Sequence, residues 1–153
     1  NVATGNLYNI LRRELKGSPC RVFIESVKTR IEAADCFFYP DVTVTCDARD
    51  RQTPDYISHP ILVIEVLSDS TAAFDRGAKF AAYRMLDSLQ EYVLVDPERR
   101  SVEIFRRLPS NDWLLATGDS ARALVLAALD MEIGFDEVFE DVAVPEAQPG
   151  AAR

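Results

Sequence analysis

The most informative hydrophobic pattern in this chain is the run Ile61–Leu67, which is aliphatic throughout except at Glu65. A continuous run of this length, rich in β-branched residues, is typical of a central strand buried on both faces. Because side chains alternate along a strand, Glu65 shares one face with Ile61, Val63 and Leu67. The pattern therefore predicts a buried strand that carries one carboxylate among aliphatic neighbours.

The remaining elements follow from hydrophobic spacing and turn residues. Helical spacing predicts a helix over Asn6–Lys16 and another from the turn Ser68–Thr71 to about Leu86. The other predictions are strands at 20–31 (with a phase slip near Ser26), Asp41–Cys46, Gln90–Val95, Val102–Arg106, Trp113–Thr117 and Ala123–Leu126, a loop over Gln52–Pro60, and a last helical turn within Ile133–Phe139. A helix between two central strands, followed by a hairpin over residues 90–106, predicts an α/β domain with a mixed sheet.

The length of the chain, 153 residues, suits one domain. We expect that domain to cover residues 1–141 and a flexible tail, rich in Pro, Ala and Gly, to cover residues 142–153. No stretch reaches the roughly 18–20 apolar residues of a membrane span, and the first residues lack a secretory signal pattern. We therefore expect a cytoplasmic protein without membrane association.

A zinc site of the usual type is an unfavoured interpretation. The chain has only three cysteines, which are widely spaced (Cys20, Cys36 and Cys46), and a single histidine, His59. We expect reduced thiols that pack as small hydrophobic side chains. One histidine also makes a Ser-His-Asp or Cys-His mechanism hard to assemble. His59 precedes Pro60 and is predicted to be a surface loop residue.

The net charge of −8 argues against a protein that binds nucleic acid by itself. The charge is unevenly distributed, however. Residues 1–30 contain six basic and two acidic residues, whereas the stretch from Asp130 contains seven acidic residues and one arginine. The basic residues of the first part are Arg12, Arg13, Lys16, Arg21, Lys28 and Arg30. The sequence thus has a basic front and an acidic end.

A lone carboxylate at Glu65 would cost several kcal/mol if it were buried without compensation. A metal ion, a cationic side chain or protonation could compensate it; alternatively, the end of the strand emerges into solvent. Asp41 opens the preceding predicted strand directly after Pro40, and two adjacent strands can bring such acids together at one sheet edge. Taken alone, Asp41 would be an ordinary acid at the start of a strand. Mg²⁺ takes one or two carboxylates plus waters, and the carbonyl of Val66 could add a further oxygen.

Lys79 lies on the predicted helix that follows, one turn after Asp75 and one turn before Tyr83. It has two interpretations. It could form an exposed helix-surface pair with Asp75, or it could direct its ammonium group towards the carboxylates and stabilise negative charge there.

Four segments together resemble a known family: Tyr39–Val42, Leu62–Ser68, Asp75–Arg84 and Leu89–Asp96. They are similar to a bacterial restriction-endonuclease family, abundant in cyanobacteria, of the PD-(D/E)XK nuclease superfamily. The resemblance covers roughly residues 5–140. It implies a restriction-endonuclease-like three-layer α/β/α core with a mixed central sheet, and hydrolysis of phosphodiester bonds that depends on Mg²⁺ or Mn²⁺.

The resemblance also implies roles for individual residues. Asp41 matches the first acid of the motif and Glu65 the second. The usual lysine falls two residues after the second acid, where this chain has Leu67, so Lys79 would be a lysine that has migrated to the helix. Three auxiliary residues are considered at the same site. They are Glu25, for which a solvated strand residue is the favoured alternative, Tyr83, which would pack against or orient Lys79, and Gln90, expected to point to the same edge.

The resulting hypothesis is metal-assisted attack of water on nucleic acid, DNA in particular. Asp41 and Glu65 would hold the metal, and Lys79 would assist the nucleophile or the phosphate. A homodimer could join two basic fronts, formed by Arg12, Arg13 and Lys16, into one groove. The alternatives are a nuclease-fold module of weak or lost activity that binds nucleic acid or a partner protein, favoured by Leu67 and the acidic net charge, and a hydrolase of another phosphoester.

Overall fold

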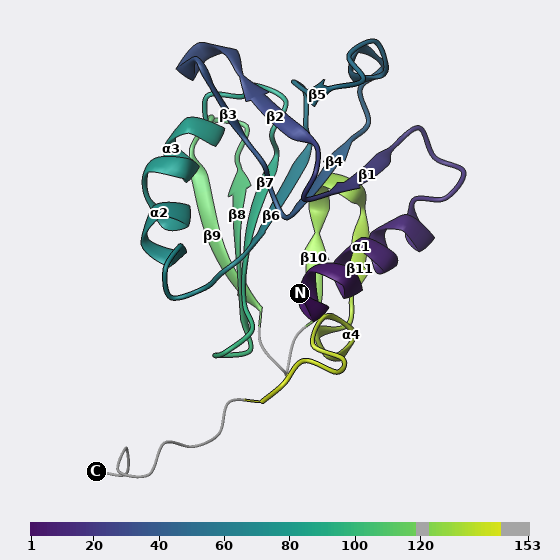
Figure 1. Ribbon diagram of the computed structural model, residues 1–153, viewed down its shortest axis with the longest axis vertical. Helices are drawn as coiled ribbons and strands as arrows, with labels where there is room; N and C mark the ends of the chain where they lie inside the picture. The colour runs from purple at the N-terminus through teal and green to yellow at the C-terminus, as the bar shows by residue number, and fades with distance from the viewer. Residues whose placement is uncertain (119–122, 145–153) are drawn as a thin grey trace.

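A six-stranded mixed sheet forms the centre of the protein in a computed structural model that describes residues 1–118 and 123–144 (Figure 1). The strand order is β1-β4-β6-β7-β8-β9. These strands are Arg21–Ile24 (β1), Val42–Thr45 (β4), Leu62–Val66 (β6), Glu91–Asp96 (β7), Ser101–Arg107 (β8) and Trp113–Gly118 (β9). Only the β6–β7 pair is parallel, while the other neighbours are antiparallel. The predicted mixed α/β class and mixed sheet are confirmed.

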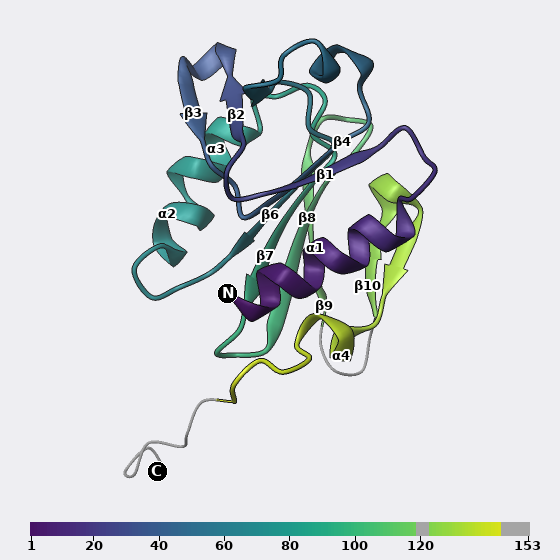
Figure 2. The same cartoon turned by 45° about the vertical axis from the view of Figure 1, so that its right-hand side comes forward.

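Helices cover both faces of this sheet, together with smaller β-structures (Figures 1 and 2). The first face carries Val2–Glu14 (α1), Phe135–Val138 (α4), and the hairpin Leu124–Leu126 (β10) and Met131–Ile133 (β11). The second face carries Ala72–Arg76 (α2), Ala78–Tyr83 (α3), and a small sheet of Lys28–Ile31 (β2), Cys36–Phe38 (β3) and Tyr56–Ile57 (β5). Short 3-10 helices occupy Glu32–Ala34, Ala48–Arg51 and Ala127–Leu129. Each outer layer therefore mixes helix with β-structure.

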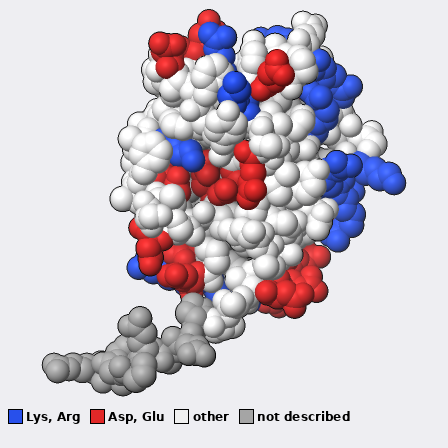
Figure 3. All heavy atoms as spheres, in the orientation of Figure 1, with Lys and Arg blue, Asp and Glu red and all other residues white. Residues whose placement is uncertain are grey.

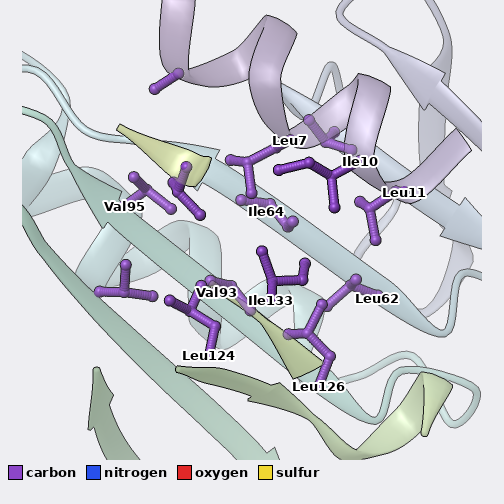
Figure 4. Close-up of a cluster of buried hydrophobic side chains, with 14 of the residues drawn as sticks. Leu7, Ile10, Leu11, Leu62, Ile64, Val93, Val95, Leu124, Leu126 and Ile133 are labelled. Atoms are coloured by element: carbon purple, nitrogen blue, oxygen red, sulfur yellow. The ribbon is translucent and has the colours of Figure 1, made fainter. Parts of the chain in front are cut away.

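The core on the first face forms between α1 and the middle of the sheet (Figure 4). Leu7, Ile10 and Leu11 share one stripe of the helix because they recur at helical spacing. They pack with Leu62 and Ile64 of β6, all of them buried. Removing this aliphatic surface from water is what holds α1 against the sheet.

The core on the second face is more aromatic. Phe80 of α3 stacks on Tyr92 of β7, with their ring centroids 4.8 Å apart. Val63 and Leu67 belong to this second core, whereas Leu62 and Ile64 belong to the first. The side chains of Leu62–Leu67 therefore alternate between the two faces, as predicted, and Glu65 points towards the second face. The prediction is wrong for Ile61, which packs against the first core because it precedes β6 and lies outside the alternation of the strand.

Two predicted elements are divided in the structure. The strand expected over 20–31 breaks at Glu25, whose φ of 45° turns the chain, so that β1 joins the main sheet and β2 joins the small one. The helix expected from Thr71 to about Leu86 breaks at Gly77 into α2 and α3. A Cβ at Gly77 would lie 3.1 Å from the carbonyl oxygen of Ala73, so this break suits glycine.

Element ends and loops differ in smaller ways. Helix α1 begins at Val2 rather than at Asn6, because the side chain of Asn1 caps it by accepting a hydrogen bond from the backbone N–H of Ala3. The predicted loop Gln52–Pro60 contains the short strand β5. Of the predicted tail, residues 145–153 lie outside the described residues. None of the helices within 1–118 and 123–144 is long and apolar enough to cross a membrane.

The prediction of three reduced cysteines is wrong for two of them, since Cys20 and Cys46 form a disulfide. Arg21 and Thr45 are partners in the β1–β4 pair, so the next residues outward, Cys20 and Cys46, face each other across it. They are 26 residues apart in sequence, and only the strand register brings them together. Cys36 is a free thiol.

His59 was expected on a surface loop, but it is partly buried and held by Asp50. The Nδ1 atom of His59 lies 3.1 Å from Oδ1 of Asp50. Asp50 is itself buried and accepts hydrogen bonds from the backbone N–H groups of Ser58 and His59 and from the hydroxyl of Thr45. The hydrogen bonds of this buried carboxylate therefore connect the loop before β6 to the end of β4.

Replacing Asp50 by Ala should lower the free energy of unfolding by about 2 kcal/mol, because several buried donors would lose their acceptor. Chemical denaturation measures the change. Asp55→Ala is the matched control, since Asp55 is an exposed acid of the same loop and its loss should cost less than about 0.5 kcal/mol. Equal effects of the two substitutions would contradict the role assigned to Asp50.

Candidate active site

Asp41 and Glu65 are brought together by the register of β4 and β6. Val42 pairs with Ile64, so the next residues along the two antiparallel strands, Asp41 and Glu65, stand opposite each other. Oδ2 of Asp41 accepts a hydrogen bond from the backbone N–H of Val66 at 2.6 Å. The side chain of Asp41 thus extends the pairing of the two strands by one position just before β4 begins.

Glu65 is 3 % exposed, so the interpretation in which the end of this strand emerges into solvent does not hold. Oε1 of Glu65 lies 2.9 Å from Nζ of Lys79. That approach lacks hydrogen-bond geometry, and Oε1 accepts no hydrogen bond from the described residues. The contact is therefore electrostatic, and a buried carboxylate oxygen remains with unused acceptor capacity.

Lys79 reaches this site from α3. Its side chain is 12 % exposed, and its Nζ lies 3.5 Å from Oδ1 of Asp75 and 5.5 Å from the ring centroid of Phe38. Asp75 is buried as well. The interpretation of Asp75 and Lys79 as an exposed helix pair is therefore wrong, because the helices turn both side chains towards the sheet.

Asp75 is the acid that the sequence pattern did not assign to the site. The pattern marked it only as a neighbour of Lys79 one turn away. Its proximity to Glu65 depends on how α2 and α3 pack on the sheet, and Tyr92 of β7 contributes to that packing by donating its hydroxyl hydrogen to the backbone carbonyl of Asp75 at 2.9 Å.

Burial dominates the acid–base behaviour of the pair. It raises the pKa of Glu65 to about 8, although the nearby charge of Lys79 acts in the opposite direction. Burial also raises the pKa of Asp41, against the hydrogen bond from Val66 and the charge of Lys79. The charges of Asp41 and Asp75 raise the pKa of Glu65 further. The site therefore resists holding all its carboxylates in the ionised form.

This charge balance fits a divalent cation. When Asp41, Glu65 and Asp75 are ionised, Lys79 compensates only one of their three charges, and two negative charges remain. Figure 3, drawn in the orientation of Figure 1, shows acidic side chains gathered near the middle of the visible surface with a basic side chain beside them. Among the described residues, no group of three or more His, Cys, Asp or Glu side chains converges as a metal cage. Two carboxylates suffice for Mg²⁺, however, which commonly completes its shell with waters.

The backbone of Val66 faces Asp41 rather than β7. Its N–H faces Asp41, and the N–H of the next residue, Leu67, donates to the carbonyl of Val95 in β7 instead. Because the N–H and C=O of one strand residue point to the same side, the carbonyl of Val66 is directed to the side of Asp41. It is thus available as a third oxygen beside the two carboxylates.

The three auxiliary residues have different placements. Glu25 is exposed and lies beside Asp41, to whose carbonyl oxygen its N–H donates. Tyr83 is fully buried, its ring lies 5.2 Å from that of Phe38, and its hydroxyl has no hydrogen-bond partner among the described residues. Burial and, next, the charge of Glu65 raise the pKa of Tyr83, so its hydroxyl stays protonated.

The expectation for Gln90 is wrong. Its N–H donates to the carbonyl of Ile61, at the start of β6, whereas Glu65 near the end of that strand pairs with Leu94. Gln90 therefore lies at the opposite end of the sheet from the carboxylates. The parallel β6–β7 register, which the local pattern does not encode, decides this.

Leu67, at the position where the resemblance led us to expect lysine, is buried in the second core. Its surroundings are apolar, and the ammonium group that reaches Glu65 comes instead from α3. The structure thus brings together Asp41, Glu65, Val66 and Lys79, adds Asp75, and leaves out Gln90.

Comparison with known proteins gives one family match, in which residues 1–136 match the family described as "Uma2: Putative restriction endonuclease". Two uncharacterized proteins of Synechocystis sp. (strain ATCC 27184 / PCC 6803 / Kazusa) are similar in sequence. One is 32% identical over 143 residues, covering 94% of this chain and 75% of the relative. The other is 34% identical over 119 residues, covering 75% of this chain and 66% of the relative.

A solved structure is similar in fold. It is a crystal structure from Anabaena variabilis ATCC 29413, described as a putative nuclease belonging to DUF820. The TM-score is 0.70, and the match covers 90% of this chain and 78% of the other at 16% sequence identity. At this identity the match speaks for the fold alone.

Proposed function

Since this chain belongs to the family described as "Uma2: Putative restriction endonuclease", we propose that it is a divalent-metal-dependent nuclease that hydrolyses phosphodiester bonds in nucleic acid, DNA in particular. The observation that carries the proposal is the buried Glu65 opposite the partly buried Asp41 and beside Lys79, with an acceptor oxygen of Glu65 left unused. The fold match supports a restriction-endonuclease-like arrangement of the core.

Asp41, Glu65 and the carbonyl of Val66 would hold Mg²⁺ or Mn²⁺. Such an ion, when bound, lowers the pKa of a water ligand and offsets charge on the phosphate. The chain's own groups position the reactants: Asp41 is fixed by the N–H of Val66, and Glu65 by its strand.

Lys79 would donate hydrogen bonds to a phosphate oxygen or to the attacking water, which helps to stabilise the negative charge that develops in the transition state. Asp75 and the ring of Phe38 hold the ammonium group in place for this role. Once Glu65 is engaged by a cation, the electrostatic contact between Lys79 and Glu65 is free to weaken in favour of the substrate.

The test is hydrolysis of plasmid DNA and of a single-stranded oligonucleotide by the purified protein with Mg²⁺, with Mn²⁺ and with EDTA. We expect cleavage with either metal and none with EDTA. The assignment as an enzyme fails if no metal-dependent cleavage is observed. It also fails if the cleavage persists in the carboxylate variants.

Replacing Lys79 by Met should lower kcat at saturating metal about 100-fold, the typical effect of losing one preorganised donor to developing charge. Metal affinity should not fall, because the ammonium repels the cation. Lys28→Met, on β2, removes the same charge without a predicted role and should leave kcat unchanged. Calorimetry gives the metal affinity and single-turnover cleavage gives the rate; an unchanged kcat in Lys79→Met would contradict the role.

A second candidate is a nuclease-fold module with weak or lost activity. The buried Leu67 in place of the superfamily's lysine favours it. In that case, metal binding would depend on Asp41 and Glu65 but cleavage would be absent in every metal.

A further inference from the structure

A second charged feature lies away from the carboxylates, in a pocket of about 540 Å³ between the end of α1 and the edge strand β1. The basic residues that line it are Arg12, Arg13, Lys16 and Arg21, and no acidic residue lines it. In a chain with a net charge of −8, such a concentration of positive charge is a local reversal of sign. Figure 3 shows basic side chains gathered along this side of the molecule.

Arg21 is the residue that makes this pocket more than an exposed basic patch. Its Nη2 atom is buried and has no hydrogen-bond partner among the described residues. Its guanidinium group lies 5.2 Å from the ring centroid of Phe23, which also lines the pocket. Arg21 also has no ion-pair partner among the described residues, so its charge is not neutralised locally, and an anionic ligand in the pocket that the guanidinium group lines would be favoured.

The other basic residues differ in how far they are already neutralised. Arg13 pairs with Glu14 and Glu137. Arg12 donates a hydrogen bond to the hydroxyl of Tyr8, and within the part of the chain that the structure describes neither Arg12 nor Lys16 has an ion-pair partner. Cations are favourable in the last turn of a helix, which accounts for Arg12 and Arg13 without any ligand. That explanation does not extend to Arg21, which lies on a strand.

We propose that this pocket binds phosphate groups of a nucleic-acid backbone. Arginine guanidinium groups suit phosphate because they present several donors in a planar fork. The pocket contains no convergent acceptors for reading bases, so it would position the nucleic acid rather than select a sequence. The identity of the ligand rests on the proposed function, whereas the anion-binding character rests on the pocket alone.

The placement suits a substrate that reaches the carboxylates. Strand β1 runs from Arg21 towards Glu25, whose N–H donates to the carbonyl of Asp41. Four strand residues span about 13 Å, which corresponds to roughly four nucleotides of one strand in B-form DNA. A single backbone could therefore contact the pocket and the candidate active site together.

The test is equilibrium binding of a fluorescent 16-mer, single-stranded and duplex, measured by anisotropy in EDTA so that no hydrolysis occurs. Arg21→Gln should weaken binding of at least one form about tenfold at low salt. The slope of log affinity against log salt concentration should become shallower by about 0.9 for duplex or 0.7 for single strands for each phosphate that the variant no longer neutralises. The double variant Arg12→Gln/Lys16→Gln, on the exposed end of α1 and the turn that follows it, should act in the same direction and does not disturb a buried group.

Arg99→Gln is the matched control, because it removes the same charge from a side chain that is 81% exposed in the turn between β7 and β8. The proposal fails if the pocket variants and Arg99→Gln have equal affinities and equal salt slopes. Glu65→Gln tests the proposed nuclease activity separately, because it removes the charge of a proposed metal ligand and leaves the pocket unchanged. If the chain proves not to cleave nucleic acid but Arg21→Gln still weakens binding selectively, the pocket assignment stands and the nuclease assignment falls.

Discussion

Replacing Glu65 by Gln should lower metal-dependent hydrolysis about 1,000-fold while the protein remains folded. A bound metal contributes several kcal/mol to the stabilisation of the transition state, and each 1.4 kcal/mol is a factor of about ten in rate. The amide keeps the shape and buried position of the carboxyl but removes the charge that attracts the cation. Glu65 is the appropriate target because its Oε1 accepts no hydrogen bond from the described residues.

The measurement is single-turnover cleavage across a metal titration, with circular dichroism as the check on folding. Asp41→Asn should have a similar effect, since its amide oxygen can still accept the hydrogen bond from Val66 while the charge is lost. Glu32→Gln removes a carboxylate that is 88% exposed and should leave the rate unchanged. Activity in Glu65→Gln equal to that of the parent protein would rule out Glu65 as a ligand.

The metal-free protein should lose roughly 4 kcal/mol of stability as the pH rises from about 5 to about 8. Burial raises the pKa of Glu65 from 4.5 to about 8 in the folded state. Between these values the folded protein holds a proton that the unfolded chain has released, so the native state binds more protons and stability falls with rising pH. The stabilisation is complete below the unfolded pKa and is lost as the pH passes about 8. The raised pKa of Asp41 acts in the same direction.

Urea denaturation at a series of pH values in EDTA measures this slope. Glu65→Gln should flatten it, because the amide does not titrate, whereas Glu32→Gln should retain it. Adding Mg²⁺ or Mn²⁺ at pH 8 should restore stability to the parent protein, since the cation binds the folded, deprotonated site. A curve for the parent that is flat between pH 5 and 8, or identical to that of Glu65→Gln, would contradict the burial argument.

These two predictions describe one physical property of the site. The fold keeps Glu65 out of water, which makes its charge unfavourable without a partner and makes a cation an effective partner. The charges of Lys79 and Asp75 shift the pKa of Glu65 in opposite directions. They do not neutralise the site, because one ammonium group faces three carboxylates. We therefore expect metal affinity to rise steeply up to about pH 8, as the proton on Glu65 ceases to compete with the cation.

The sequence by itself predicted most of the local elements of this protein and the adjacency of Asp41 and Glu65. The aliphatic run around Glu65 predicted a buried strand, and the structure agrees. Alternation correctly placed Val63 and Leu67 on the face of the carboxylate, but not Ile61, which precedes the strand. The resemblance to a nuclease family, carried by four segments, is matched by a family model over residues 1–136. Such features are readable because periodicity and burial act over a few neighbouring residues.

Only the tertiary structure decided which distant residues meet. The β1–β4 register paired Cys20 with Cys46, and the parallel β6–β7 register placed Gln90 at the far end from Glu65. The packing of α2 and α3 turned Asp75 inward, and the folded chain buried one nitrogen of Arg21. The physical reason is the same in each case: strand register and helix docking are set by contacts between residues far apart in the chain, which a local pattern does not encode.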